Sequence, residues 1–345
     1  MVCFGVVGCG YWGPNLVRNL IRLPGSRVKT VCDSSKERLA HVSRLYPEIG
    51  TTCCFDDIVD DVDIDAVVIA TPVRLHFDMA RRSLEAGKHT FIEKPMARSG
   101  RECEALIELA EPRRLTLMVG HTFIYSTPVI KTKEIIESGE LGHIQYINTR
   151  RLNLGLFQKD INVAWDLAPH DISTLLYLLD EMPVSVSCHG KAHITSGIED
   201  VADITLDFAG GAFASIQSSW LNPNKIRETV VVGTHKMLVY NDMEASEKIK
   251  IYDKRVEVPP HFDNLGEFQY SYHYGNVYSP YLKLVEPLAV ECSHFLDCIL
   301  TGRTPDSSGY DGLNVVRVLE AADRSLRNGG ARVEIDSLVE QGALG

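Results

Sequence analysis

The chain has 345 residues, a hydrophobic fraction of 45% and a formal net charge of −11 at pH 7. This length suggests two domains with buried cores, and the acidic balance argues against nucleic acid as a partner, because phosphate binding needs a concentrated basic surface. No signal peptide or uninterrupted apolar span is recognisable, so we expect a cytoplasmic protein with no membrane partner. Nine cysteines without a C-x-x-C pair are expected to be reduced packing residues, and no metal site is predicted.

The first predicted element is a strand over Val2–Val7 that runs directly into a glycine-rich turn with G-x-G-x-x-G spacing. A helical pattern over Leu16–Leu23 follows at once. In this context the first glycine permits a tight turn and the second lets a pyrophosphate approach the backbone. The third lets the helix pack closely on the strand while its N-terminus faces the phosphates. We therefore expect a dinucleotide site formed by Gly8, Gly10, Tyr11, Trp12 and Gly13.

A second predicted strand, Val28–Cys32, ends at Asp33, about twenty residues beyond the turn. A carboxylate there accepts hydrogen bonds from the adenosine ribose hydroxyls and repels a 2′-phosphate, which favours NAD over NADP. Ser34 and Arg38 are expected at the same site, and Arg38 could compensate a phosphate and so weaken the preference. Alternatively, Asp33 and Ser34 only cap the helix that follows.

Strands and helices alternate up to residue 120. Apolar strands joined by helical crossovers predict an α/β fold, here a Rossmann-type, doubly wound parallel sheet covered on both faces. Further strands are predicted at Ala66–Ala70, Thr90–Ile92 and Thr116–Val119, and further helices at Lys36–Tyr46, Leu75–Ala86 and Arg101–Leu109.

Three groups of residues follow the ends of these strands. Glu93-Lys94-Pro95 comes directly after Thr90–Ile92, and ligands of doubly wound sheets bind beyond the carboxyl ends of the strands. Lys94 is therefore expected to project at the cofactor crevice, although a surface turn that happens to contain a lysine is the alternative. Glu93, Thr71, Pro72 and His121 are expected to contribute to the same crevice.

After a linking helix, Val129–Ser138, the pattern becomes strand-rich, with Gly210-Gly211 as a hairpin turn. This predicts an α+β domain over residues 122–345, with a largely antiparallel open sheet, beside a nucleotide-binding domain over residues 1–121. Helices are predicted at Ala168–Leu179, Val285–Ile299 and Leu313–Leu326. Strands are predicted at Ile144–Arg150, Val184–His189, Ala202–Phe208, Ala212–Ser219, Glu228–Gly233, Met237–Tyr240 and Lys248–Tyr252.

The second chemical cluster is Trp165-Asp-Leu-Ala-Pro-His-Asp171. Asp166 and His170 are four residues apart and share one face if the helix has begun there, while an apolar stripe beginning at Ile172 faces the core. In the alternative, Asp166 only caps the helix and His170 fills a polar niche.

Several side chains near these clusters are candidates for substrate contact. Lys225 and Arg227 could meet a diphosphate or carboxylate, or could belong to a solvated turn. The aromatic run from Tyr270 to Tyr278 could stack on sugar rings, or could belong to a core or interface. The remaining substrate candidates are Tyr125, Arg151, Asn153 and Asn162, and Trp165 is a candidate for the cofactor.

Together, the glycine turn, Thr71-Pro72, Glu93-Lys94-Pro95 and the Asp-x-x-x-His helix resemble the Gfo/Idh/MocA family of oxidoreductases over essentially the whole chain. Gly-Tyr-Trp-Gly-Pro-Asn and Trp-Asp-Leu-Ala-Pro-His-Asp look most like members associated with nucleotide-sugar or glycoside metabolism. The resemblance implies an NAD-dependent enzyme that oxidises one ring hydroxyl of a sugar, cyclitol or sugar derivative, reversibly. It also implies homodimers or homotetramers.

Carried onto this chain, the resemblance makes Lys94, Asp166 and His170 the catalytic group. In one assignment His170 takes the hydroxyl proton, Lys94 donates a hydrogen bond to the reacting oxygen and Asp166 holds the pair in geometry. In the other, Lys94 is the proton acceptor. Two further functions stay open: a redox-neutral glycoside cleavage or epimerisation that uses NAD transiently, and an NAD-sensing protein without catalysis.

Overall fold

The computed structural model describes residues 1–257 and 271–335 of the chain. The chain divides into two compact units. One comprises Met1–Ser126 and Val285–Glu320, and the other comprises Thr127–Leu284 and Ala321–Gly345. Packing thus places one late helix and the beginning of another with the first unit, whereas the domain boundary predicted between residues 121 and 122 follows the change of sequence pattern.

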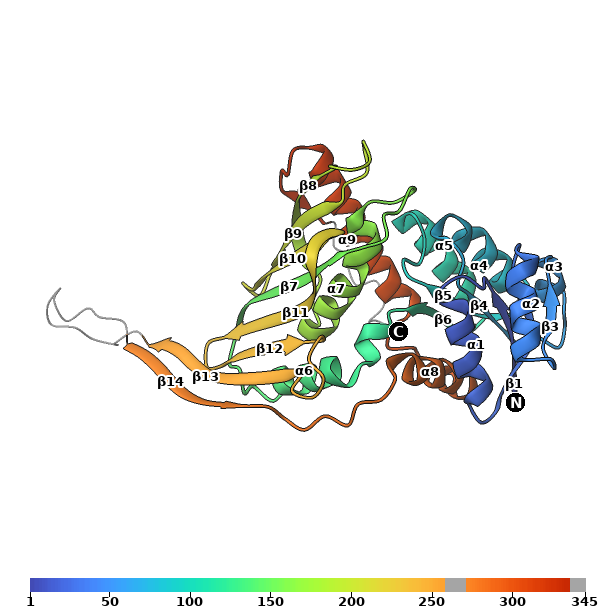
Figure 1. Cartoon of the computed structure of the whole chain (residues 1–345), viewed down its shortest axis with the longest axis horizontal. Helices are drawn as coiled ribbons and strands as arrows, with labels where there is room; N and C mark the ends of the chain where they lie inside the picture. The colour runs from blue at the N-terminus through green and yellow to red at the C-terminus, as the bar shows by residue number, and fades with distance from the viewer. Residues whose placement is uncertain (258–270, 336–345) are drawn as a thin grey trace, which may run out of the picture. The chain divides into compact units, whose positions relative to one another are not determined.

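The first unit contains the predicted doubly wound sheet. Six parallel strands lie in the order β3-β2-β1-β4-β5-β6, which is the order of a Rossmann fold (Figure 1). This confirms the predicted fold class. The strands are β1 (Val2–Val7), β2 (Ser26–Cys32), β3 (Gly50–Thr52), β4 (Ala66–Ile69), β5 (His89–Glu93) and β6 (Leu117–Gly120). Strand β3 escaped prediction because its three residues carry no apolar pattern.

Helices flank this sheet, and one from late in the chain completes its core. The Phe295 ring of α8 lies 6.1 Å from that of Phe4 in β1 and 5.7 Å from that of Phe91 in β5, between centroids. Helix α9 begins in this unit and ends in the second. The helical elements are α1 (Gly13–Arg22), α2 (Lys36–Leu45), α3 (Asp56–Val59), η1 (Val73–Leu75), α4 (His76–Glu85), α5 (Gly100–Ala110), η2 (Thr122–Tyr125), α8 (Pro287–Thr301) and α9 (Gly309–Arg327).

The second unit is built on a nine-stranded sheet in the order β14-β13-β12-β11-β7-β10-β9-β8-β15 (Figure 1). Every neighbouring pair is antiparallel except β7 and β10, which run parallel, so the sheet is largely antiparallel as predicted. The strands are β7 (Ile144–Leu154), β8 (Pro183–Lys191), β9 (Val201–Phe208), β10 (Phe213–Ser219), β11 (Leu221–Gly233), β12 (Met237–Asn241), β13 (Ile249–Glu257), β14 (Ser271–Tyr278) and β15 (Val333–Glu334).

Among the described residues, two helices belong wholly to this unit: α6 (Thr127–Glu137) and α7 (Val163–Leu179). Helix α7 packs on β7, β9 and β10. It begins five residues before the predicted start at Ala168, because Asn162 caps it by accepting a hydrogen bond from the backbone N–H of Trp165 at 3.1 Å. Pro169 lies inside the helix, where its nitrogen cannot donate to the carbonyl of Trp165.

The aromatic run forms a strand that sequence patterning missed. Strand β13 continues past the predicted end at Tyr252 and pairs with β14. Tyr272 and Tyr274 of β14 are 63% and 74% exposed, so they are not core residues. Tyr270 lies outside the described residues.

All nine cysteines are free thiols, six of them buried. No helix in the described ranges combines the length and apolarity that a membrane crossing requires.

The turn between β1 and α1 generates a test of the fold. A Cβ on Gly13 would lie 1.9 Å from the carbonyl oxygen of Gly8, whereas a Cβ on Gly10 would meet nothing within 4 Å. Gly13→Ala should therefore destabilise the free protein by at least about 1–3 kcal/mol, the usual cost of overpacking, while Gly10→Ala leaves its melting temperature nearly unchanged. Equal melting temperatures for both variants in thermal denaturation would contradict this geometry.

Candidate active site

The glycine turn forms a backbone cradle at the carboxyl end of β1. Gly8 has a φ of +95°, which suits glycine, and its N–H donates to the carbonyl of Cys32 at the end of β2 at 2.8 Å. Gly13 contacts the Gly8 carbonyl too closely for any side chain. Tyr11 and Trp12 are exposed between them. The open space over Gly10 and the N-terminus of α1 fit a pyrophosphate.

Asp33 is buried and tied to this turn. Its Oδ2 accepts from the backbone N–H of Cys9 at 2.6 Å, and its Oδ1 accepts from the N–H of Ser35 at 2.7 Å. Ser35, not Asp33 or Ser34, caps α2, by accepting from the N–H of Arg38. Asp33 therefore joins the glycine turn to the end of β2.

A pocket of about 620 Å³ opens beside this junction. Its lining combines residues of the glycine turn and α1 with residues of α2, and it includes Ser34 and Arg38, two of the three residues predicted for the ribose end of the site. The lining residues are Cys9, Pro14, Ser34, Ser35, Glu37, Arg38, His41, Val42 and Arg44. The guanidinium of Arg38 lies 3.6 Å from Asp33. The cradle, the buried carboxylate and the pocket fit the dinucleotide predicted from sequence.

The turns after β4 and β5 are held together by a histidine that sequence reasoning missed. His76 at the start of α4 is buried, with Nε2 2.7 Å from the carbonyl oxygen of Thr71 and Nδ1 2.9 Å from that of Pro95. Burial lowers the pKa of His76. Because Thr71 follows β4 and Pro95 follows Lys94, this ring joins the turn after β4 to the residue that follows the predicted catalytic lysine. Lys94 itself is half-buried.

Glu93 and His121 lie at the ends of the neighbouring strands β5 and β6. Both are buried, and burial raises the pKa of Glu93 to about 7 despite the opposing charge of Lys94. Burial lowers the pKa of His121 to about 3, so its ring is neutral. Tyr125 is also buried, with its hydroxyl 2.9 Å from that of Ser307.

In the second unit, Asp166 and His170 share helix α7, as the spacing predicts. Asp166 is not the helix cap; its Oδ2 accepts from Nε1 of the buried Trp220 at 3.0 Å. The carbonyl of His170 accepts from the hydroxyls of Ser173 and Thr174. Trp220 thus orients Asp166, a contact that their separation in sequence conceals.

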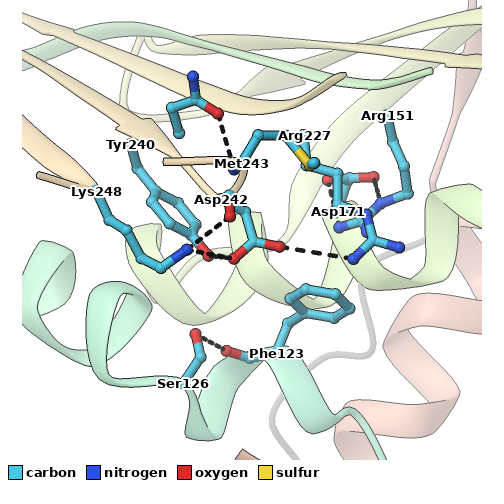
Figure 2. Close-up of polar contacts among 10 residues, drawn as sticks. Phe123, Ser126, Arg151, Asp171, Arg227, Tyr240, Asp242, Met243 and Lys248 are labelled. Atoms are coloured by element: carbon cyan, nitrogen blue, oxygen red, sulfur yellow. Dashed lines mark hydrogen bonds and ion pairs between the residues drawn. The ribbon is translucent and has the colours of Figure 1, made fainter. Parts of the chain in front are cut away.

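Arg151 forms an ion pair immediately beside His170. Its Nε donates to Asp171 Oδ2 at 2.7 Å and its Nη2 to Oδ1 at 3.2 Å, and both residues are buried (Figure 2). This bidentate pair anchors α7 to β7. Asn162, besides capping α7, donates to Glu199 and Asp323.

The remaining substrate candidates lie on the strands of the second sheet. Arg227 is 3.5 Å from Asp242, which also binds Lys248 and Tyr240 (Figure 2). Lys225 is exposed, and Asn153 on β7 is half-buried.

Comparison with known proteins identifies the family of two long stretches of the chain. The family model described as an oxidoreductase family with an NAD-binding Rossmann fold, GFO_IDH_MocA, matches residues 2–121. The GFO/IDH/MocA C-terminal domain matches residues 129–239.

Named relatives and a solved structure agree with this. The scyllo-inositol 2-dehydrogenase (NAD(+)) of Bacillus subtilis is 27% identical, over 94% of each chain. The UDP-N-acetylglucosamine 3-dehydrogenase of Acidithiobacillus ferrooxidans is 30% identical, over 62% of this chain and 66% of its own. A levoglucosan dehydrogenase, solved with NADH and levoglucosan, has a TM-score of 0.79 at 22% identity, covering 97% of this chain and 100% of its own, and shows the shared fold. The chain therefore belongs to the Gfo/Idh/MocA family of NAD-binding oxidoreductases.

Proposed function

We propose that this protein is an NAD-dependent dehydrogenase or ketoreductase for a ring hydroxyl of a sugar, nucleotide sugar or glycoside. The proposal rests on one observation. The cradle formed by Gly8, Gly13 and Asp33 belongs to the same sheet as strand β5, and Lys94 directly follows that strand. Relatives named as inositol and UDP-N-acetylglucosamine dehydrogenases support a hydroxylated ring as the substrate.

In the proposed mechanism, the cradle and Asp33 hold the cofactor, with further contacts from the pocket residues, Thr71, Pro72, Glu93, His121 and Trp165. Bound NAD supplies the hydride acceptor. Lys94, Asp166 and His170 act on the hydroxyl. His170 removes its proton, Lys94 stabilises the charge that develops on oxygen, and Asp166, held by Trp220, keeps the group in place. The assignment of Lys94 as proton acceptor stays open.

Substrate recognition is proposed to divide between direct and indirect contacts. Asn153, Lys225 and Arg227 are candidates to touch the substrate, and the two cations suit a diphosphate or carboxylate. Arg151 acts through its ion pair with Asp171, and Asn162 acts through the start of α7. Tyr125, whose hydroxyl is bonded to Ser307, is the weakest of the direct candidates.

The protein is proposed to work as a cytoplasmic homodimer or homotetramer, with no nucleic-acid or membrane partner. The central strands β7 and β10 expose the stacked rings of Tyr146 and Phe213, which lie 5.4 Å apart and are 36% and 43% exposed. Asn148 and Ser215, joined by a hydrogen bond, lie next to them. This face thus carries a polar pair beside the aromatic pair, and the aromatic pair is its candidate contact.

The catalytic assignment predicts a loss of turnover without a loss of fold. Lys94→Ala and His170→Ala should each lower turnover by roughly 10² or more, the usual scale for a lost acid–base or oxyanion group. NAD affinity and melting temperature should stay nearly unchanged, as they should in the surface control Lys131→Ala. The assay is NADH absorbance with UDP-sugars, free sugars, glycosides and inositols, with mass spectrometry of the products. Near-normal turnover per folded molecule in both variants would remove the mechanism, and reducing sugar released without net NADH would indicate redox-neutral chemistry.

The Asp33 carboxylate predicts a preference for NAD. The unmodified protein should bind NAD at least about tenfold more tightly than NADP, and Asp33→Ala should reduce this ratio. Arg38→Ala is the matched control, because it should weaken NADP binding while sparing NAD. Titration calorimetry that finds equal or tighter NADP binding in the unmodified protein would exclude the assignment.

The exposed aromatic pair predicts self-association. Sedimentation at micromolar concentration should show a dimer or tetramer, and Tyr146→Asp combined with Phe213→Asp should shift it toward the monomer, because two charges would be buried unpaired. Tyr274→Asp, on the edge strand β14, serves as a comparison. A monomeric unmodified protein would refute the proposal.

A further inference from the structure

Three buried polar residues, Glu93, His121 and Glu291, form a cluster in the first unit at the ends of strands β5 and β6. Strands β5 and β6 pair with Glu93 opposite Gly120, and a Cβ on Gly120 would lie 3.1 Å from Glu93 Oε2, so this carboxyl rests on the end of β6. His121 and Thr122 follow directly. Thr122 Oγ1 donates to Oε2 of Glu291 on α8 at 2.8 Å. Glu93, His121 and Glu291 are 6%, 1% and 0% exposed.

Four buried polar atoms of this cluster have no hydrogen-bond partner among the described residues: Glu93 Oε1, Glu291 Oε1, and Nδ1 and Nε2 of His121. Buried polar groups are normally satisfied, directly or through a bridging water. The number of hydrogen-bond donors among these four atoms must therefore be compared with the number of acceptors.

The balance depends on whether one of the two carboxyls is protonated. A neutral histidine offers one donor and one acceptor, and each ionised carboxylate offers an acceptor. If Glu93 and Glu291 were both ionised, three acceptors would compete for one donor. A proton on one of the two carboxyls supplies a second donor, and two donors then match two acceptors.

Burial and charge favour Glu291 as the carboxyl that carries this proton, because Glu291 is fully buried whereas Glu93 adjoins Lys94. Burial and the charge of Glu93 raise the pKa of Glu291 well above its usual range, against the hydrogen bond from Thr122. Lys94 is the cation that acts on Glu93 and His121. Burial also raises the pKa of the neighbouring Cys292 thiol, which stays neutral.

We propose that Glu291 is a neutral carboxylic acid at physiological pH that donates a hydrogen bond into the Glu93–His121 cluster, leaving Glu93 as the titrating carboxyl beside Lys94. Glu291 is thus a positioning residue, which acts on Lys94 through Glu93. The link to Lys94 rests on the proposed function, but the protonation of Glu291 does not.

The first test is stability against pH for Glu291→Gln. Glutamine keeps an acceptor for Thr122 and an N–H donor for the cluster, so this variant should fold. Because the folded protein holds the Glu291 proton more tightly than the unfolded chain, the unmodified protein loses stability as pH rises above the unfolded pKa near 4.5. Glu291→Gln lacks this loss. The difference obtained by subtracting the melting temperature of the unmodified protein from that of the variant should therefore increase from acid to alkaline pH. A constant or falling difference would overturn the proposal.

Glu286→Gln is the matched control on the same chain segment. Hydrogen bonding to Arg18 lowers the pKa of Glu286, so this carboxylate stabilises the fold at higher pH. The control should therefore lose melting temperature relative to the unmodified protein as pH rises, the opposite sign from Glu291→Gln.

Infrared spectroscopy of the cofactor-free protein gives a second readout that does not need activity. At a pH about two units above the pKa of Glu93, the C=O stretch of a protonated carboxyl should remain, because one acid group stays neutral. The band should disappear in Glu291→Gln. Its absence from the unmodified protein would overturn the proposal.

The kinetic arm tests the link to Lys94. Glu291→Gln should keep the pH profile of kcat/KM, whereas Glu291→Leu, which supplies no donor, should move its acid limb to higher pH because Glu93 ionises less readily. Coincident profiles for both variants would remove the positioning role. No turnover in any variant, with the stability and infrared results as expected, would count against the proposed function alone.

Discussion

The close approach of Gly13 to the carbonyl oxygen of Gly8 is the constraint on which the first unit depends. It brings the start of α1 against the end of β1, so the unpaired N–H groups of the helix face the space above the turn. The Asp33 carboxylate then joins Cys9 to Ser35, which ties this turn to the end of β2. The phosphate and ribose parts of the proposed cofactor site are therefore one hydrogen-bonded unit.

Similar contacts recur across the sheet. Buried polar side chains connect the carboxyl ends of other neighbouring strands. His76 bridges the turns after β4 and β5, and the Glu93 carboxyl rests on the end of β6. Glu291 reaches this cluster from α8, a late helix that belongs to the first unit, through its hydrogen bond with Thr122. Lys94, whose proposed role is to stabilise developing charge, therefore lies between two residues, Glu93 and Pro95, that make these contacts.

The sequence predicted the features that depend on residues close together in the chain. The glycine turn, the alternation of strands and helices, and the helix that carries Asp166 and His170 each have a signal within a few residues. Pro169 obscured the true start of α7 because proline usually marks a first turn, and β14 was missed because its side chains are exposed rather than alternating. The partners of the site residues had no such signal: Trp220 on Asp166, Asp171 on Arg151 and Glu291 on Thr122 are contacts that only tertiary packing creates.

The central claim is that hydride leaves a ring carbon of the substrate for the nicotinamide. Its most direct test uses a substrate found in the screen, deuterated at the carbon that carries the reacting hydroxyl, with mass spectrometry of the cofactor after a single turnover. Direct transfer predicts deuterium in the reduced cofactor, with none lost to water. Reduced cofactor without deuterium, or deuterium released to solvent, would contradict it.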